Sequence, residues 1–272
     1  MAAANRASFR GRAGAPYGPR GPPRCSPAAI APNPRVFYAG EVTTPLAAPL
    51  AALADDYAAW WIDFLGEHNH VGGEEATRWL LDRARLAAGD RMLDCGAFVG
   101  ASARIAARRL GVRPVAVDLE ADFLKAGREL PGGEAVAWLV ANTQRLPFPD
   151  QAFQSVWSLD SYISVREMSR VAAARATICL CCETPDDSRG GLDSFLDEWR
   201  EFGWEMSAHK TVTIDALQAW RHAEAELVAK RSRYEARYGK RPYLGQLDLM
   251  SHLVAGYERG GMGHSLLVFA RG

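Results

Sequence analysis

After Gly89 the chain changes from amphipathic helical spacing to short apolar runs that alternate with helical segments. Short runs rich in apolar and β-branched residues predict strands, and apolar residues spaced three and four apart predict helices. The predicted strands are 91–96, 114–118, 135–141, 154–159, 176–182, 205–212 and 264–270, and the predicted helices among them are 101–110, 120–130, 164–174 and 191–202. This alternation indicates parallel strands joined by right-handed crossovers, hence a doubly wound α/β sheet that binds its ligand at the carboxyl ends of the strands.

Helical patterns flank this core on both sides. The predicted flanking helices are 46–65, 74–88, 213–238 and 243–259. The first of them places Tyr57, Trp60, Trp61 and Phe64 on one stripe. The stripe has two interpretations, core packing across the sheet or a lid whose ring faces contact an acceptor. The last strand follows a Gly-Gly-Met-Gly turn, so it could join the sheet antiparallel.

Charge divides the chain into an arm and a body. The 32 basic and 32 acidic residues cancel, but the first 40 residues hold six arginines and no acidic residue, so the rest is acidic overall. Residues 1–35 also hold seven of the 15 prolines, and we expect a disordered, basic arm. Their composition fits an organelle transit peptide too, or an extension without function.

Several classes of protein are excluded by composition. No run of about 18 apolar residues is present, so we expect no membrane span. The five cysteines are odd in number and form no CxxC pair, which argues against a disulfide framework and against zinc. Cys179, Cys181 and Cys182 lie in one predicted strand, where neighbours face opposite sides, so they cannot all share one ligand. We therefore expect a cytoplasmic protein without a metal site.

The most informative local feature is a glycine loop, Asp94-Cys-Gly-Ala-Phe-Val-Gly100, between a predicted strand and a helix. Glycines at such a turn let the backbone approach a bound nucleotide, and the helix begins with free N–H groups. Asp118 ends the next strand, where a carboxylate can accept both ribose hydroxyls. Because Asp94 directly precedes the loop, a cationic ligand suits the site better than a pyrophosphate. A tight turn without a ligand is the structural alternative.

These residues resemble the class I S-adenosylmethionine-dependent methyltransferases, whose first motif reads acid-x-Gly-x-Gly-x-Gly. Asp94, Gly96 and Gly100 match this motif, whereas Phe98 replaces the middle glycine and narrows the room around the methionine moiety. Asp118 matches the family's ribose-binding acid.

A second segment, residues 141–157, is also similar to this family. It contains the run Leu-Pro-Phe-Pro-Asp followed by Phe-Gln-Ser-Val-Trp, which is typical of the small-molecule branch. With this segment the resemblance spans roughly residues 70–272 and implies S-adenosylmethionine as cofactor. The cofactor-binding residues that it implies are Asp94, Gly96 and Gly100 at the methionine end, Asp118 at the ribose, Asn142 and Thr143 at the adenine, and additionally Leu119 and Ser158.

Methyl transfer needs a general base only when the acceptor must lose a proton. The fourth strand ends close to the methyl group in this family, which favours Asp160 and Tyr162, with His70 as a further candidate. His68 and His70 could equally be solvated turn residues, and Glu183 could cap a helix or pair with an arginine. The expected acceptor-binding residues are Tyr57, Trp60, Trp61 and His68.

The sequence therefore predicts a seven-stranded, mostly parallel Rossmann-like methyltransferase sheet with an N-terminal helical lid. We divide the chain into the arm 1–35 and a methyltransferase domain 36–272. Within that domain the expected parts are a lid region 36–88, a cofactor-binding core 89–212, and a helical insert with the closing strand 213–272.

The expected reaction moves a methyl group to a small molecule of secondary or lipid-like metabolism. A nucleotide-dependent oxidoreductase and a non-catalytic interaction protein are the alternatives. We expect no nucleic-acid partner, because the charged helix around Glu226 and Lys230 is typical of a solvated face, and a homodimer remains open.

Overall fold

The computed structural model describes residues 62, 64–185 and 191–271. The expected arm, about half of the lid region and the aromatic residues Tyr57, Trp60 and Trp61 lie outside the described residues. The described part is built on one seven-stranded sheet, with the strand order β3-β2-β1-β4-β5-β7-β6.

The strands have the bounds β1 Arg91–Cys95, β2 Arg113–Asp118, β3 Ala137–Val140, β4 Phe153–Leu159, β5 Ala172–Pro185, β6 Trp204–Thr211 and β7 Met262–Arg271. The pairs that join β3, β2, β1, β4 and β5 are parallel, whereas β7 runs antiparallel between β5 and β6. The predicted doubly wound, mostly parallel fold and its antiparallel closing strand are therefore confirmed.

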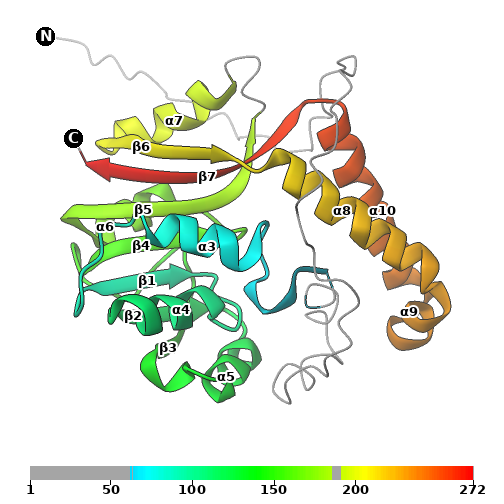
Figure 1. Ribbon diagram of the computed structural model, residues 1–272, viewed down its shortest axis with the longest axis horizontal. Coiled ribbons are helices and arrows are strands. Elements are labelled where there is room, and N and C mark those ends of the chain that lie inside the picture. Colours follow the sequence, from blue (N-terminus) through cyan, green and yellow to red (C-terminus); the bar gives the residue numbers. More distant parts are fainter. Residues whose placement is uncertain (1–61, 63, 186–190, 272) are drawn as a thin grey trace, which may run out of the picture.

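Helices cover both faces of the sheet and extend to one side of it (Figure 1). Their bounds are η1 Gly66–His68, α3 Gly73–Leu81, α4 Ala101–Leu110, α5 Ala121–Glu129, η2 Gly133–Ala135, α6 Val165–Val171, α7 Gly191–Glu201, α8 Thr213–Ala229, α9 Arg231–Tyr238 and α10 Lys240–Glu258. The strand β1 points toward the side on which α8 and α10 lie, so the carboxyl ends of the parallel strands open toward these two helices.

Alternate residues of the central strands supply two separate cores. Cys179 and Cys181 of β5 belong to the core that α3, α8 and α10 cover, and Cys182 belongs to the core on the opposite face. Strand geometry requires this alternation. The prediction that the three thiols cannot share one ligand is confirmed, and all four cysteines among the described residues are free and buried.

Two predicted helices differ from those in the structure. The helix expected over 74–88 ends at Leu81, because the chain turns there and Arg85 adopts a left-handed φ of 52°. The hydroxyl of Thr177 donates to the freed carbonyl of Ala84 at 2.8 Å. The helix expected over 213–238 is divided at Lys230, where φ is −106° and ψ is 25°.

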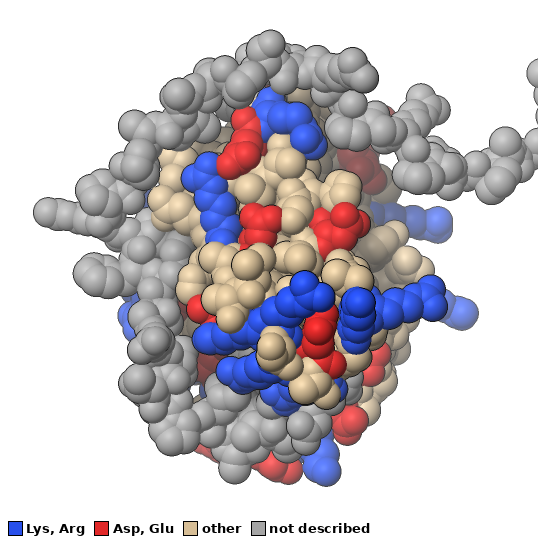
Figure 2. Space-filling model, turned by 90° about the vertical axis from the view of Figure 1, so that its right-hand side faces the viewer, with Lys and Arg blue, Asp and Glu red and all other residues tan. Residues whose placement is uncertain are grey.

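Basic side chains gather on the face that α9 forms, in the lower half of the view in Figure 2. Lys230 pairs with Glu226 and Arg231 pairs with Glu235, each one helical turn apart. Pairs of this kind stabilise exposed helices by a few tenths of a kcal/mol, about 0.2–0.5 each. Such ion pairs are typical of a solvent-exposed helix face.

Candidate active site

The glycine loop joins β1 to α4, and close packing requires its glycines. Gly96 has a φ of 67°, and a Cβ there would lie 2.4 Å from the Cβ of Ser161. Gly100 has a φ of 64°, and its Cβ would lie 2.6 Å from the ring of Trp138. Both positions combine a left-handed backbone with a neighbour that leaves no room for a side chain.

Phe98 takes the left-handed conformation that a glycine would adopt at this position, with a φ of 52°. Its backbone N–H donates to Asp118 at 2.9 Å, and its buried ring meets Phe123 edge to face with 4.8 Å between the centroids. Strain of this kind costs on the order of 1–3 kcal/mol and persists where the surroundings enforce it. The replacement of the middle glycine therefore keeps the shape of the loop and adds an aromatic wall.

Two acidic residues stand at the loop. Asp94 is 3% exposed, and burial together with the nearby Asp118 raises the pKa of Asp94 to about 7. Asp118 is fixed at the end of β2, because its two oxygens accept from the N–H groups of Phe98 and Glu120. A cationic ligand beside this buried carboxyl would favour its ionised form, so the two would attract each other.

Asp94 and Asp118 both line a cavity of about 250 Å³, hereafter the loop cavity. Five of the eight expected cofactor-binding residues line it: Asp94, Gly96, Asp118, Leu119 and Thr143.

Three expected cofactor residues do not line the loop cavity. Gly100 packs against Trp138, and Asn142 is exposed, with its side-chain oxygen accepting the N–H of Gln144. Ser158 is fully buried, and its hydroxyl bonds that of Ser161 at 2.9 Å. Gly100 and Ser158 therefore lie behind the residues that line the cavity, and Asn142 lies in an exposed turn outside it.

A second, larger cavity of about 840 Å³, hereafter the acceptor cavity, adjoins the first. The two share Asn69, Phe98, Phe123 and the run Asp160 to Tyr162 in their walls. Most of the remaining wall is apolar, and Trp220 of α8 with Leu249 and Leu253 of α10 contribute to it. Three titratable side chains line this cavity but not the first: Cys182, Glu183 and His264.

Asp160 lies where the two cavities meet, and its side chain is 17% exposed. One carboxylate oxygen lies 2.9 Å from Nε2 of His264, and the other accepts the N–H of Val71 at 2.8 Å. Burial alone would raise the pKa of Asp160, but the charge and hydrogen bond of His264 outweigh burial and lower it. The group is therefore a carboxylate near neutral pH.

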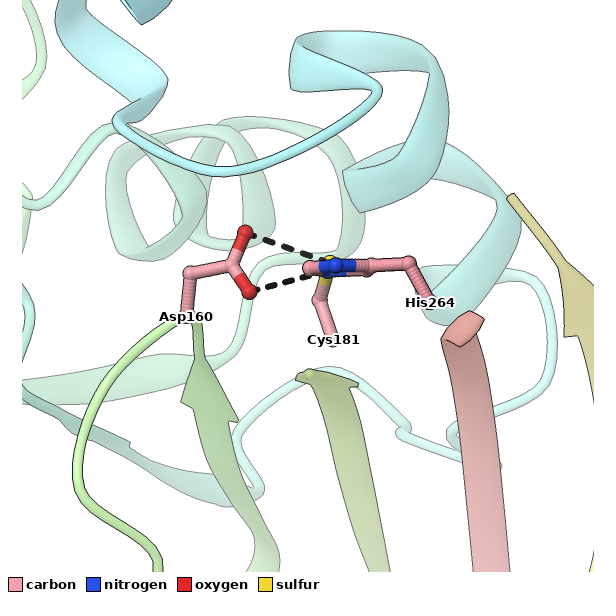
Figure 3. Close-up of side chains that lie close together, drawn as sticks. All are labelled: Asp160, Cys181 and His264. Carbon is pink, nitrogen blue, oxygen red and sulfur yellow. Dashed lines mark hydrogen bonds and ion pairs between the residues drawn. The ribbon is translucent and has the colours of Figure 1, made fainter. Parts of the chain in front are cut away.

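His264 belongs to β7 and is joined on its other side to Tyr257, whose hydroxyl lies 2.9 Å from Nδ1. Cys181 of β5 places its Sγ 3.5 Å from Nε2 of His264 and 3.7 Å from Asp160 (Figure 3). Sequence reasoning missed both His264 and Cys181, because the pairing of β5 with β4 brings Cys181 to Asp160 and the pairing of β7 with β5 brings His264 there. The structure thus adds a histidine and a thiol to the expected carboxylate.

The two loop histidines are placed differently from solvated turn residues. His70 is 1% exposed, with Nδ1 3.1 Å from the carbonyl of Val71 and Nε2 3.0 Å from the hydroxyl of Thr77, and burial lowers its pKa. Burial, together with the charges of His70 and Arg104, lowers the pKa of His68 to about 3. The interpretation of His70 as a solvated residue is wrong, although both histidines line the loop cavity.

Of the other expected residues, Tyr162 is 59% exposed at the wall that both cavities share. Glu183 lines the acceptor cavity, and burial raises its pKa. Tyr57, Trp60 and Trp61 cannot be placed, since they fall outside the described residues.

Comparison with known proteins identifies the family of the core. Residues 92–180 match the family model described as a methyltransferase domain. Methyltransferase GfsG of Streptomyces halstedii is 30% identical over 110 residues, which cover 36% of this chain and 40% of that protein. The 27-O-demethylrifamycin SV methyltransferase of Amycolatopsis mediterranei is 28% identical over 161 residues, covering 54% of this chain and 58% of that protein. The chain thus spans about half the length of these two relatives.

A solved structure shares the fold at low sequence identity. The putative sarcosine dimethylglycine methyltransferase from Galdieria sulphuraria superimposes with a TM-score of 0.68 at 15% identity, covering 80% of this chain and 98% of the other. No helix within the described ranges is both long and apolar enough to cross a bilayer. Residues 92–180 thus carry a methyltransferase domain, and the seven-stranded sheet around them shares the fold of this solved structure.

Proposed function

We propose that this chain transfers a methyl group from S-adenosylmethionine to a mainly apolar small molecule. The observation that carries the proposal is the meeting of two cavities at Asp160. One cavity holds the acid-glycine residues of the family, and the other is large and mainly apolar. A ligand in each would bring its reacting end to the wall that the two cavities share.

The loop cavity suits the proposed cofactor. The close approach at Gly96 leaves backbone rather than side chain facing the cavity, and Asp94 supplies a buried carboxyl for a positive charge. Asp118 can accept ribose hydroxyls, because each of its oxygens has capacity beyond its one backbone partner. Thr143 and Leu119 lie at the same cavity and would contact the nucleoside.

When bound, the cofactor supplies a sulfonium methyl that is already activated toward a nucleophile. The protein then contributes mainly by holding the acceptor in line and excluding water. Phe98 and Phe123 form an apolar wall at the junction. Asp160, held by His264 and by the Val71 N–H, presents a carboxylate that would orient a hydroxyl or amine of the acceptor and accept its proton.

The acceptor cavity supports an apolar molecule with one polar end. Leu65, Ile163, Trp220, Leu249 and Leu253 line it, and its polar groups Asp160, Glu183 and His264 come from neighbouring strand ends. This arrangement favours acceptors of secondary or lipid-like metabolism. The name of the Amycolatopsis relative, a methyltransferase of a rifamycin, fits the same class of acceptor.

We also propose a cytoplasmic location, which the free, buried thiols of the described strands support. A homodimer is an open expectation that size-exclusion chromatography with light scattering tests.

The experiment that tests the proposed activity is a transfer assay with methyl-labelled S-adenosylmethionine. The full chain is incubated with apolar hydroxyl and amine compounds, matched in each case by an analogue lacking that group. We expect label in at least one extractable product, and loss of labelling in Asp160→Asn with little change in cofactor affinity. Equal labelling by Asp160→Asn would remove Asp160 from the chemistry, and no product from a broad panel, with the cofactor bound, would favour a non-catalytic member of the family.

A further inference from the structure

Three side chains with different ligand atoms converge at the carboxyl ends of neighbouring strands. Asp160 follows β4, Cys181 belongs to β5, and His264 belongs to β7, which pairs with β5 (Figure 3). Their carboxylate oxygen, Sγ and imidazole nitrogen all lie within 4.8 Å of one another. A fully buried thiol usually packs as a small apolar group, but this one faces a carboxylate, an imidazole and the Val71 carbonyl.

The separations fit one cation at the centre of the three groups. Around a tetrahedral zinc ion with bonds of ~2.0–2.3 Å, ligand atoms lie about 3.3–3.6 Å apart. Here Sγ lies 3.5 Å from Nε2 of His264, and Nε2 lies 2.9 Å from Asp160 Oδ1, while the other carboxylate oxygen, Oδ2, lies 3.7 Å from Sγ. The thiol and the imidazole already have the required separation, and the carboxylate would have to move away from the imidazole by about half an ångström.

Neighbouring groups already orient the imidazole and the carboxylate as metal ligands. Tyr257 bonds Nδ1 of His264 at 2.9 Å, which can fix the tautomer that leaves Nε2 free to ligate. The Val71 N–H bonds Oδ2 of Asp160 at 2.8 Å, which leaves Oδ1 facing His264. Partners of this kind support a metal-binding histidine and carboxylate in metalloproteins.

One side of the cluster is open. Asp160 and His264 both line the acceptor cavity, whereas Cys181 is fully buried beneath them. We propose that Asp160, Cys181 and His264 bind one divalent cation of zinc-like softness, whose fourth position faces the acceptor cavity. Sulfur, nitrogen and oxygen ligands together select such an ion over Mg²⁺ or Ca²⁺.

Binding of the cation does not depend on methyl transfer, but its role rests on the proposed function. With the cation present, the polar end of the acceptor would meet the metal rather than the carboxylate, and an acceptor hydroxyl bound there would lose its proton more readily. Without it, the same three side chains form only a hydrogen-bonded cluster.

A cobalt titration distinguishes these two states. The full chain is freed of metal with a chelator, titrated with Co²⁺ and followed by absorption, because a thiolate ligand produces a charge-transfer band and tetrahedral Co²⁺ produces strong visible bands. We expect both at one equivalent, and their loss when Zn²⁺ is added. Cys181→Ser should lose the charge-transfer band, and Cys179→Ser is the matched control, since this buried thiol lies two residues away outside the cluster.

Tyr257→Phe removes only the hydroxyl that orients His264, so it tests the site without removing a ligand. We expect roughly 10- to 100-fold weaker Co²⁺ binding in this variant. Thermal unfolding confirms that each variant is folded. The absence of a thiolate band in the wild-type chain, or an unchanged band in folded Cys181→Ser, would overturn the metal site. A chain that binds Co²⁺ as described but does not bind S-adenosylhomocysteine would instead contradict the proposed function.

Discussion

Gly96 is the residue at which the backbone of the loop is most tightly constrained. Its φ of 67° is strained for any side chain, and a Cβ would also overlap the Cβ of Ser161 at 2.4 Å. Ser161 cannot move freely, because its hydroxyl donates to the carbonyl of Cys95 at 2.7 Å. The shape of the loop cavity therefore depends on the missing side chain at this position.

We expect Gly96→Ala to lower the free energy of unfolding by about 1–3 kcal/mol from overpacking, and by more once backbone strain is included. It should also weaken S-adenosylhomocysteine binding. The control is Gly89→Ala, where φ is 85° and no atom lies within 4 Å of the added Cβ. Both variants carry the backbone strain of a positive φ, but only Gly96→Ala adds the overlap with Ser161. Equal losses in the free energy of unfolding, measured with a denaturant, would show that the contact with Ser161 does not matter.

Asp94 should make the stability of the chain depend on pH. Its pKa is raised from 3.8 to about 7, so the folded chain binds more protons than the unfolded chain between these values. The free energy of unfolding should therefore fall as pH rises through this range, by on the order of 4 kcal/mol relative to Asp94→Asn. Chemical denaturation of both proteins at several pH values measures the difference.

Cofactor binding should show the opposite dependence on pH. A cation favours the ionised form of Asp94, so the affinity for S-adenosylmethionine should rise up to tenfold per unit as pH increases toward about 7. Asp94→Asn should bind weakly and with little dependence on pH. A wild-type affinity that is flat across this range would show that Asp94 does not meet the positive end of the cofactor.

At the scale of elements, α8 and α10 form the outer wall of the acceptor cavity, with Trp220, Leu249 and Leu253 facing it. The sequence predicts long helices here, since their apolar spacing is regular. It does not predict the break at Lys230, because no glycine or proline marks it. The helices α8 and α10 pack on each other, and such tertiary packing, which local patterns do not contain, supplies most of the stability of a helix in a folded protein.

The double variant Leu249→Ala, Leu253→Ala should raise the KM for the acceptor roughly 10-fold, because it removes apolar contact area in the larger cavity. The affinity for S-adenosylhomocysteine should not change. Leu244→Ala is the control, since Leu244 is a 45% exposed leucine of the same helix that does not line the cavity. Steady-state kinetics with an acceptor from the labelling assay decide the point, and a KM that stays constant in the double variant would place the acceptor elsewhere.

At the scale of the whole molecule, the order of strands and helices follows from the sequence because each buried strand is a distinct apolar run between helical segments. The acid-glycine loop and Asp118 are predictable for the same reason, as they directly follow such runs. The cluster of Asp160, Cys181 and His264 depends instead on the register of β5 against β4 and of the antiparallel strand β7 against β5, which local patterns do not contain. The position of Asn142 outside the loop cavity likewise depends on the turn that its own side chain forms.

Binding of S-adenosylmethionine in the loop cavity can be measured by isothermal titration of the full chain with S-adenosylhomocysteine and, separately, with NAD. We predict one saturable site for S-adenosylhomocysteine, at least tenfold weaker binding in Asp118→Ala, and no heat with NAD. Saturable binding of NAD, or no binding of S-adenosylhomocysteine by the folded chain, would show that the loop cavity is not an S-adenosylmethionine site.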